Sequence, residues 1–288
     1  MTETAAGLDM PKPFLEIVVH EVDPDPSLTA LCVCYELGTW RSREFAKHLF
    51  EWLPEFALSW PERQTFKDST SVELLRKAAA VVYESEKYQK RGEFGELILH
   101  IIVRQVFKSE PAISKIFFKD SVNITVKGFD AVHVVAAGDE LELWLGEAKF
   151  YNNISKAISD VVEELKEHFQ ADYLRTEFGL IVNKLPEGWS HTQSIKALLH
   201  PNTSLDTVFK TITVPVLLTY DSPTVSSHDK HEAQYAEEFE SEVRKHWATF
   251  AGKELPTNVR IRLLLLPLYE KAALLKELDG LLKTWQNI

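Results

Sequence analysis

Apolar residues recur along the chain with two spacings, and each spacing predicts one kind of element. Apolar residues three or four positions apart, as in "SREFAKHLFEWL", are typical of amphipathic helices. Short apolar runs bounded by turn residues, such as "VRIRLLLLPLY", are typical of buried strands. The first pattern predicts helices over 42–53, 71–108, 155–169, 231–250 and 270–285. The second predicts strands over 28–37, 112–119, 128–150 (a hairpin), 178–184, 208–220 (one or two strands) and 259–269.

The order of these elements indicates the fold class. From residue 71 onwards the order is helix, three strands, helix and strand, followed by further strands and helices. Hairpins mixed with helices favour an α/β fold with a mixed sheet flanked by helices. Residues 1–13 resemble a loose tail, and the polar stretch 61–71 is the best candidate boundary. We therefore expect an N-terminal extension over 1–70, packed on a core domain over 71–288.

A few single residues add local detail. Ser42 and Ser155 stand where helices are expected to begin, and serine is a favoured N-cap residue. Pro215 is expected to mark a bulge, a bend or an edge strand, because proline cannot donate to a sheet ladder. Cys32 and Cys34 share a face of a predicted strand. A zinc site or a disulfide framework needs more ligands at other spacings, so we interpret them as small buried apolar residues.

The hairpin "GFDAVHVVAAGDELELWLGEAKF" carries charges in strands that should be buried. A two-residue turn at Gly138-Asp139 pairs the strands so that Asp130 lies directly opposite Glu147. Opposed residues of two antiparallel strands share a face of the sheet. Lys149 follows Glu147 by two positions and therefore points to the same face. The sequence thus predicts two carboxylates and one ammonium group in one place.

Two facing carboxylates repel each other, and a divalent cation between them would reverse the sign of that interaction. Mg²⁺, with Mn²⁺ as an alternative, binds to one or two carboxylates together with waters and phosphate oxygens. An ammonium group beside such an ion suits phosphodiester hydrolysis. The alternative interpretation is a charged patch at a strand end, since Glu164 and Lys166 repeat the same Glu-x-Lys spacing inside a helix.

A further acid stands at the head of the apolar helix that precedes the hairpin. In "GEFGELILH", Glu93 and Glu96 lie on roughly the same helix face, and Glu96 is nearer the apolar part. A carboxylate in the first turn either compensates the helix dipole or serves as a further metal ligand. We expect Glu96 to be the supporting acid of the site.

The net charge of −11 argues against a protein that coats nucleic acid by bulk electrostatics. Any contact with DNA would therefore use a local basic patch, and the densest is "KYQKRG" with Lys87, Lys90 and Arg91. The first residues lack the pattern of a signal peptide, and no stretch reaches the roughly 20 apolar residues of a membrane span. We expect a cytoplasmic protein that does not enter a membrane.

Several other polar residues have plain structural interpretations. His133 should point away from Asp130 and serve as a buried structural histidine. His228 and His231 are too isolated in sequence to indicate zinc, and a polar loop or a helix start is expected there. The acids of 231–250 form a solvated face, a partner-docking surface or a mimic that repels DNA. The chain has no P-loop, dinucleotide-binding or nucleophile-elbow motif.

The region over roughly 75–185 resembles the restriction-endonuclease-like PD-(D/E)xK nuclease core. The resemblance lies in Glu96, in "GFD" with Asp130, and in "GEAK" with Glu147 and Lys149, followed by a helix and a strand. The usual Pro-Asp is Phe-Asp here. A wider likeness includes "CYELGTWRSREFAKHL", "GEFGELILH", "LGEAKFY" and "VPVLLTYDS", and the chain resembles the HamA family of the Hachiman anti-phage defence system.

The resemblance implies a DNA nuclease that acts with a HamB-like helicase partner. It also implies that Asp130 and Glu147 are metal ligands, that Lys149 is the catalytic lysine and that Glu96 is a supporting acid. A second hypothesis is a non-catalytic subunit that keeps the fold and regulates a helicase. The complete set of Asp130, Glu147 and Lys149 favours the enzyme, because a structural subunit has no need of opposed carboxylates.

Overall fold

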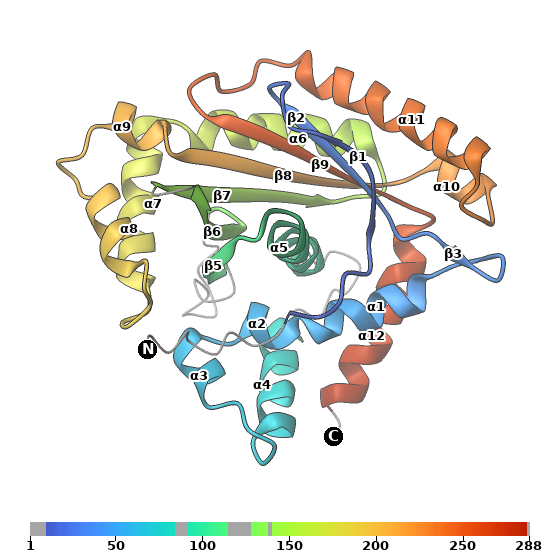
Figure 1. Cartoon of the computed structure of the whole chain (residues 1–288), viewed down its shortest axis with the longest axis horizontal. Helices are drawn as coiled ribbons and strands as arrows, with labels where there is room; N and C mark the ends of the chain where they lie inside the picture. The colour runs from blue at the N-terminus through green and yellow to red at the C-terminus, as the bar shows by residue number, and fades with distance from the viewer. Residues whose placement is uncertain (1–9, 84–91, 115–127, 138–139, 287–288) are drawn as a thin grey trace.

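A computed structural model describes residues 10–83, 92–114, 128–137 and 140–286. The described strands form a seven-stranded mixed sheet in the order β1-β2-β9-β8-β7-β6-β5 and a two-stranded ribbon, β3-β4 (Figure 1). Strands β2, β9, β8 and β7 are parallel, whereas β1, β6 and β5 pair antiparallel with their neighbours. The strands are β1 (Glu16–Glu21), β2 (Ser27–Cys32), β3 (Tyr35–Glu36), β4 (Thr39–Trp40), β5 (Glu110–Ser114), β6 (Ala131–Ala137), β7 (Glu140–Phe150), β8 (Ile212–Asp221) and β9 (Arg260–Leu268).

Helices cover both faces of the sheet, which confirms the predicted α/β class. Helix α5 (Glu93–Phe107), buried nearly all round at Phe94–Val103, lies against one face, with α1 (Ser42–Glu51), α4 (Ser71–Tyr83) and α12 (Lys271–Gln286) beyond it (Figure 1). Helix α11 (Ala233–Ala251) lies on the other side. The remaining helices are α2 (Leu53–Ala57), α3 (Trp60–Gln64), α6 (Ile154–His168), α7 (Ala171–Lys184), α8 (Thr192–Leu198), α9 (Leu205–Phe209) and α10 (Pro223–Ser227).

Most predicted elements are present, and the strand expected over 178–184 is wrong. These residues form the second half of α7. Leu174, Phe178 and Ile181 are buried along one side of that helix, at helical spacing. The local run "FGLIVNK" conceals this spacing because the period is visible only when the preceding "DYLRTE" is included. The strand expected over 112–119 is seen as β5, with residues 115–119 outside the described part of the chain.

The prediction for Pro215 is also wrong. Pro215 lies in β8, a central strand between β7 and β9, and neither pairing shows a register shift. The alignment places it beside Gly146 of β7, where a Cβ atom would lie 3.4 Å from Pro215 Cγ and 2.8 Å from Leu99 Cδ2. The absence of a side chain at Gly146 therefore makes room for the proline ring and for α5 at the same point.

Three further expectations are refined. The N-cap of α6 is Asn153, whose side chain accepts a hydrogen bond from Lys156 N, and not Ser155. Ser42 begins α1 as predicted, after Arg41. The strand expected over 28–37 ends at Cys32.

The division into 1–70 and 71–288 stays a prediction, although β1 and β2 extend the same sheet as the later strands. Among the helices of the described ranges, none combines the length and apolar character needed to cross a membrane.

Candidate functional site

The register of the β6–β7 hairpin is the one predicted from the sequence. The pairing runs from Ala131 opposite Gly146 to Ala137 opposite Glu140. Asp130 precedes this ladder, and its N–H donates at 2.8 Å to the carbonyl of Gly146, the residue that Ala131 faces, so the regular pairing ends at Ala131. Its carboxylate oxygen Oδ2 accepts a hydrogen bond from Ala148 N at 2.9 Å. Asp130 thus lies at the end of the ladder, beside Gly146 and Ala148, where its side chain satisfies a backbone donor of the neighbouring strand.

Glu147 is held in an unusual environment for a carboxylate. Its side chain is buried, with a residue exposure of 1%. Burial, followed by the negative charge of Asp130, raises the pKa of Glu147 to about 7, although His168 and Lys149 oppose the shift. His168 Nδ1, at the end of α6, lies 2.7 Å from Glu147 Oε1. Burial would lower the pKa of His168, but the hydrogen bond and charge of Glu147 raise it overall.

Lys149 shares the Glu147 face of β7, as predicted, and both residues contact α6. The Lys149 ammonium group donates to Glu164, and Glu147 contacts His168 one turn further along the helix. Lys149 is buried, whereas the Glu164 side chain is 39% exposed. The structure therefore brings Asp130, Glu147 and Lys149 together.

Glu96 is buried in the first turn of α5. This helix covers the opposite face of β7, since a Cβ atom at Gly95 would meet Phe150 Cβ at 2.8 Å and Ala148 Cβ at 3.7 Å. Glu96 therefore does not share the face of Glu147 and Lys149, and its role as a metal ligand stays a prediction. Lys87, Lys90 and Arg91 lie outside the described residues.

Three residues near the site were not singled out from the sequence. They are His168 at the end of α6, and Tyr173 and Glu177 on α7. The rings of His168 and Tyr173 stack with centroids 4.5 Å apart, and a Cβ atom at Gly128 would lie 2.7 Å from Glu177 Oε2. The sequence does contain a signal for His168, because its helical spacing places it on the same buried face of α6 as Val161 and Leu165. Tyr173 and Glu177 precede the wrongly predicted strand, in a stretch for which no element was predicted.

The chemistry of these donors fits a hard divalent cation. Two buried carboxylates lie near each other, and the negative charge of Asp130 contributes to the raised pKa of Glu147. Mg²⁺ needs only one or two carboxylates, because waters and phosphate oxygens complete its coordination. Asp130 and Glu147 are thus the residues that would hold the ion.

A buried polar network on the α5 face is distinct from this site. His133 Nδ1 lies 2.9 Å from Ser109 Oγ, and His133 Nε2 lies 3.3 Å from His100 Nδ1 of α5. Burial holds the pKa of His133 well below its usual range, so this histidine is neutral. The prediction of a structural histidine facing away from Asp130 is confirmed.

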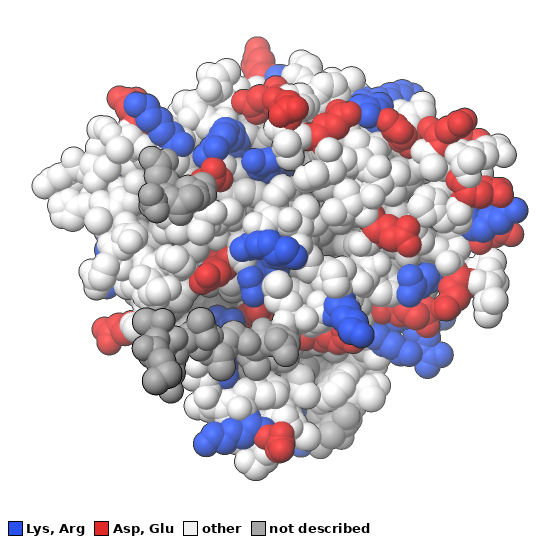
Figure 2. Space-filling model, in the orientation of Figure 1, with Lys and Arg blue, Asp and Glu red and all other residues white. Residues whose placement is uncertain are grey.

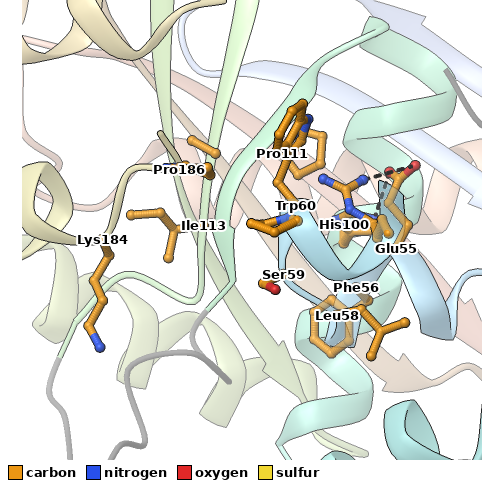
Figure 3. Close-up of a pocket in the computed structure, with 13 residues that line it drawn as sticks. Glu55, Phe56, Leu58, Ser59, Trp60, His100, Pro111, Ile113, Lys184 and Pro186 are labelled. Atoms are coloured by element: carbon orange, nitrogen blue, oxygen red, sulfur yellow. Dashed lines mark ion pairs between the residues drawn. The ribbon is translucent and has the colours of Figure 1, made fainter. Parts of the chain in front are cut away.

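A pocket of about 230 Å³ lies next to this network, and Figure 3 shows its lining residues. Its lining is mainly apolar, with Glu55 and His100 among the polar groups, and it includes Phe56, Trp60, Ile113 and Pro186. Asp130, Glu147 and Lys149 do not line this pocket. The pocket and the carboxylate pair are therefore separate features.

The raised pKa values predict how stability depends on pH in the metal-free protein. Glu147 and His168 both hold protons more tightly in the folded chain than in the unfolded chain. Their contribution to the free energy of unfolding is therefore complete below the pKa values of the unfolded chain. It is lost as the pH rises through the pKa values of the folded chain. We expect the urea midpoint to fall between about pH 5 and 8. Glu147→Gln should make the urea midpoint less dependent on pH, whereas substitution of the exposed Glu163 with Gln should leave the dependence unchanged. Equal slopes of the urea midpoint against pH in both variants would contradict the assignment.

Together, the mixed sheet and the paired carboxylates with a neighbouring lysine define an α/β protein with a candidate metal site. The HamA family model matches residues 10–282, and the chain belongs to the HamA family. This membership indicates involvement in Hachiman anti-phage defence. No curated protein matches the chain.

Proposed function

We propose that this HamA protein is a metal-dependent DNA nuclease with a PD-(D/E)xK core that acts with a HamB-like helicase. The observation that carries the proposal is the proximity of Asp130 and Glu147 at the end of the β6–β7 pairing, with Lys149 on the face of Glu147. A purely structural pair would place two like charges together at a cost that the raised pKa of Glu147 reflects. A cation bound between the two carboxylates would replace their repulsion with attraction, and the cation could then bind a phosphate.

Each residue has a defined role in this proposal. Asp130 and Glu147 would hold Mg²⁺, or Mn²⁺ in its place, with Glu96 as a supporting acid. When bound, the ion supplies a Lewis acid that activates water and offsets phosphate charge. The Lys149 ammonium would orient the attacking water or a phosphate oxygen. His168, through its hydrogen bond at 2.7 Å, would position Glu147 and help to keep it ionised.

The contacts with α6 support control of the activity by a partner. Glu147 and Lys149 are both buried, and both already contact α6 side chains, His168 and Glu164. We expect these contacts to rearrange when a substrate binds. Gating by the helicase also has a physical purpose, because an unrestrained nonspecific nuclease would attack the host genome.

Cleavage of plasmid DNA tests this proposal. The chain together with its helicase partner is expected to cleave with Mg²⁺ and not with a chelator, and the isolated chain is expected to cleave less. A complex that assembles but never cleaves in Mg²⁺ or Mn²⁺ would instead favour the non-catalytic subunit that regulates a helicase.

Delivery of DNA by the partner gives a separate prediction. Basic and acidic side chains are interspersed on the face in Figure 2, and the net charge is −11, so the isolated chain should bind DNA weakly at physiological salt. Replacing Lys87, Lys90 and Arg91 with alanine should lower cleavage and reduce the salt slope of DNA binding by about one unit for each phosphate that is no longer neutralised. Helicase binding and the melting temperature should not change. Tight binding by the isolated chain, or full cleavage by the triple variant, would contradict this account.

A further inference from the structure

A second group of metal-binding side chains lies where β1, the end of β2 and the start of α11 meet. Within the described ranges, Glu16, Cys34 and His231 form the group of three ligand-type residues whose ligand atoms all lie within 4.8 Å of one another. His231 Nδ1 is 3.2 Å from Glu16 Oε2 and 3.9 Å from Cys34 Sγ. Cys32 Sγ lies 2.7 Å from Cys34 Sγ. A carboxylate, an imidazole and two sulfurs therefore converge here.

The fold explains why these residues meet although they are distant in sequence. The antiparallel pairing of β1 with β2 places Glu16 directly opposite Cys32. Cys34 has a φ angle of 61°, in the left-handed region, and this turn brings its thiol back beside Cys32. His231 precedes α11 and lies 197 positions from Cys34. Tyr235, in the first turn of α11, contacts Cys32 and His231, with its hydroxyl 3.1 Å from Cys32 Sγ and its ring centroid 5.2 Å from that of His231.

The spacing of the ligand atoms is close to that of a tetrahedral zinc site. Zinc lies about 2.3 Å from thiolate sulfur and about 2.0–2.2 Å from imidazole nitrogen or carboxylate oxygen. A tetrahedron with these bonds separates nitrogen from oxygen by about 3.3 Å and sulfur from nitrogen by about 3.5 Å. The observed separations of 3.2 and 3.9 Å are near these values. The two sulfurs are closer than the roughly 3.7 Å between two zinc-bound thiolates, so Cys32 would have to rotate away from Cys34 to join them.

The identity of the donor atoms also favours zinc. A thiolate is the form of cysteine that binds metals. The mixed set of sulfur, nitrogen and oxygen donors suits zinc, whereas Mg²⁺ prefers oxygen ligands alone.

We propose that Glu16, Cys34 and His231 bind one zinc ion, with Cys32 as the fourth ligand. The ion would join the first strand of the sheet to the loop before α11, and its binding energy would stabilise that junction. Cys34 is buried, whereas Glu16 and His231 are exposed, so the ion has a route from solvent. This site is independent of the proposed nuclease function, because it shares no residue with Asp130, Glu147 or Lys149.

The metal content of the full-length chain tests the proposal, using zinc or cobalt(II) as the probe. One zinc per chain is expected after loading and dialysis, and cobalt(II) should show sulfur-to-metal charge-transfer absorption. His231→Ala and Glu16→Gln change exposed side chains, so both variants should fold and hold zinc at least tenfold more weakly. His228→Ala is the matched control, because His228 lies in the same loop but contacts Glu238.

The outcomes separate clearly. Equal zinc affinity in wild type, His231→Ala and Glu16→Gln would overturn the proposal, as would a cobalt complex without sulfur ligation. A disulfide between Cys32 and Cys34 in the purified chain, detected by mass as the loss of two hydrogens, would also overturn it. Asp130→Asn should keep its zinc, so failure of the nuclease proposal and failure of the zinc proposal are distinguishable.

Discussion

Replacing Lys149 with alanine is expected to lower Mg²⁺-dependent DNA cleavage by about 100-fold or more while the fold and the helicase complex are kept. The ammonium group lies on the Glu147 face of β7, where its positive charge opposes the rise in the pKa of Glu147. Its removal would leave the ligands of the ion in place and take away only the group that orients water or phosphate. The rate of cleavage at saturating Mg²⁺ measures this effect.

The chain itself offers a matched control. Lys166 stands in the other Glu-x-Lys stretch, on α6, where its ammonium donates to Glu254 at 2.8 Å on the surface. Lys166→Ala should cleave like wild type. Glu164→Gln removes the charge that holds Lys149 and should have a smaller effect than Lys149→Ala. Equal cleavage by wild type and Lys149→Ala would show that the lysine is structural.

Mg²⁺ or Mn²⁺ is expected to raise the melting temperature of wild type, and Asp130→Asn is expected to abolish the rise. An ion at 100 times its dissociation constant stabilises the folded state by about 2.7 kcal/mol if it ignores the unfolded chain. Asparagine keeps an oxygen that can accept from Ala148 N, so the backbone contact of Asp130 survives in the variant. The loss of charge therefore changes ion binding more than folding.

The rise should also depend on pH. Glu147 must ionise to bind a cation, and its pKa is about 7 in the metal-free chain, so the Mg²⁺-induced rise should grow from pH 6 to pH 8. The exposed Asp172, in the first turn of α7, offers a control, and Asp172→Asn should respond like wild type. An equal rise in Asp130→Asn would place the ion elsewhere.

The geometry of the hairpin could be predicted because it depends on local rules. The turn length sets the register, and the register sets which residues oppose each other. Asp130, Glu147 and Lys149 were therefore found from about twenty consecutive residues. The burial of α5 followed in the same way from an apolar pattern on all sides of the helix.

The parts that failed depend on contacts between distant segments. Pro215 occupies a central strand because Gly146, on another strand, leaves space for it. The cluster of Glu16, Cys34 and His231 forms only when β1, β2 and α11 meet, and no local spacing indicates it. The strand prediction for 178–184 failed for a different reason, since a window of seven residues is too short to separate the two periods.

The measurement that tests the central claim most directly is the position of a bound Mn²⁺ ion. Crystals of the full-length chain, soaked at a Mn²⁺ concentration that saturates the melting shift, would locate the ion by its anomalous scattering. The account predicts an ion held by a carboxylate oxygen of Asp130 and one of Glu147, with the Lys149 ammonium nearby. An ion bound elsewhere, with Glu147 still paired to His168 and no anomalous signal between the two carboxylates, would contradict it.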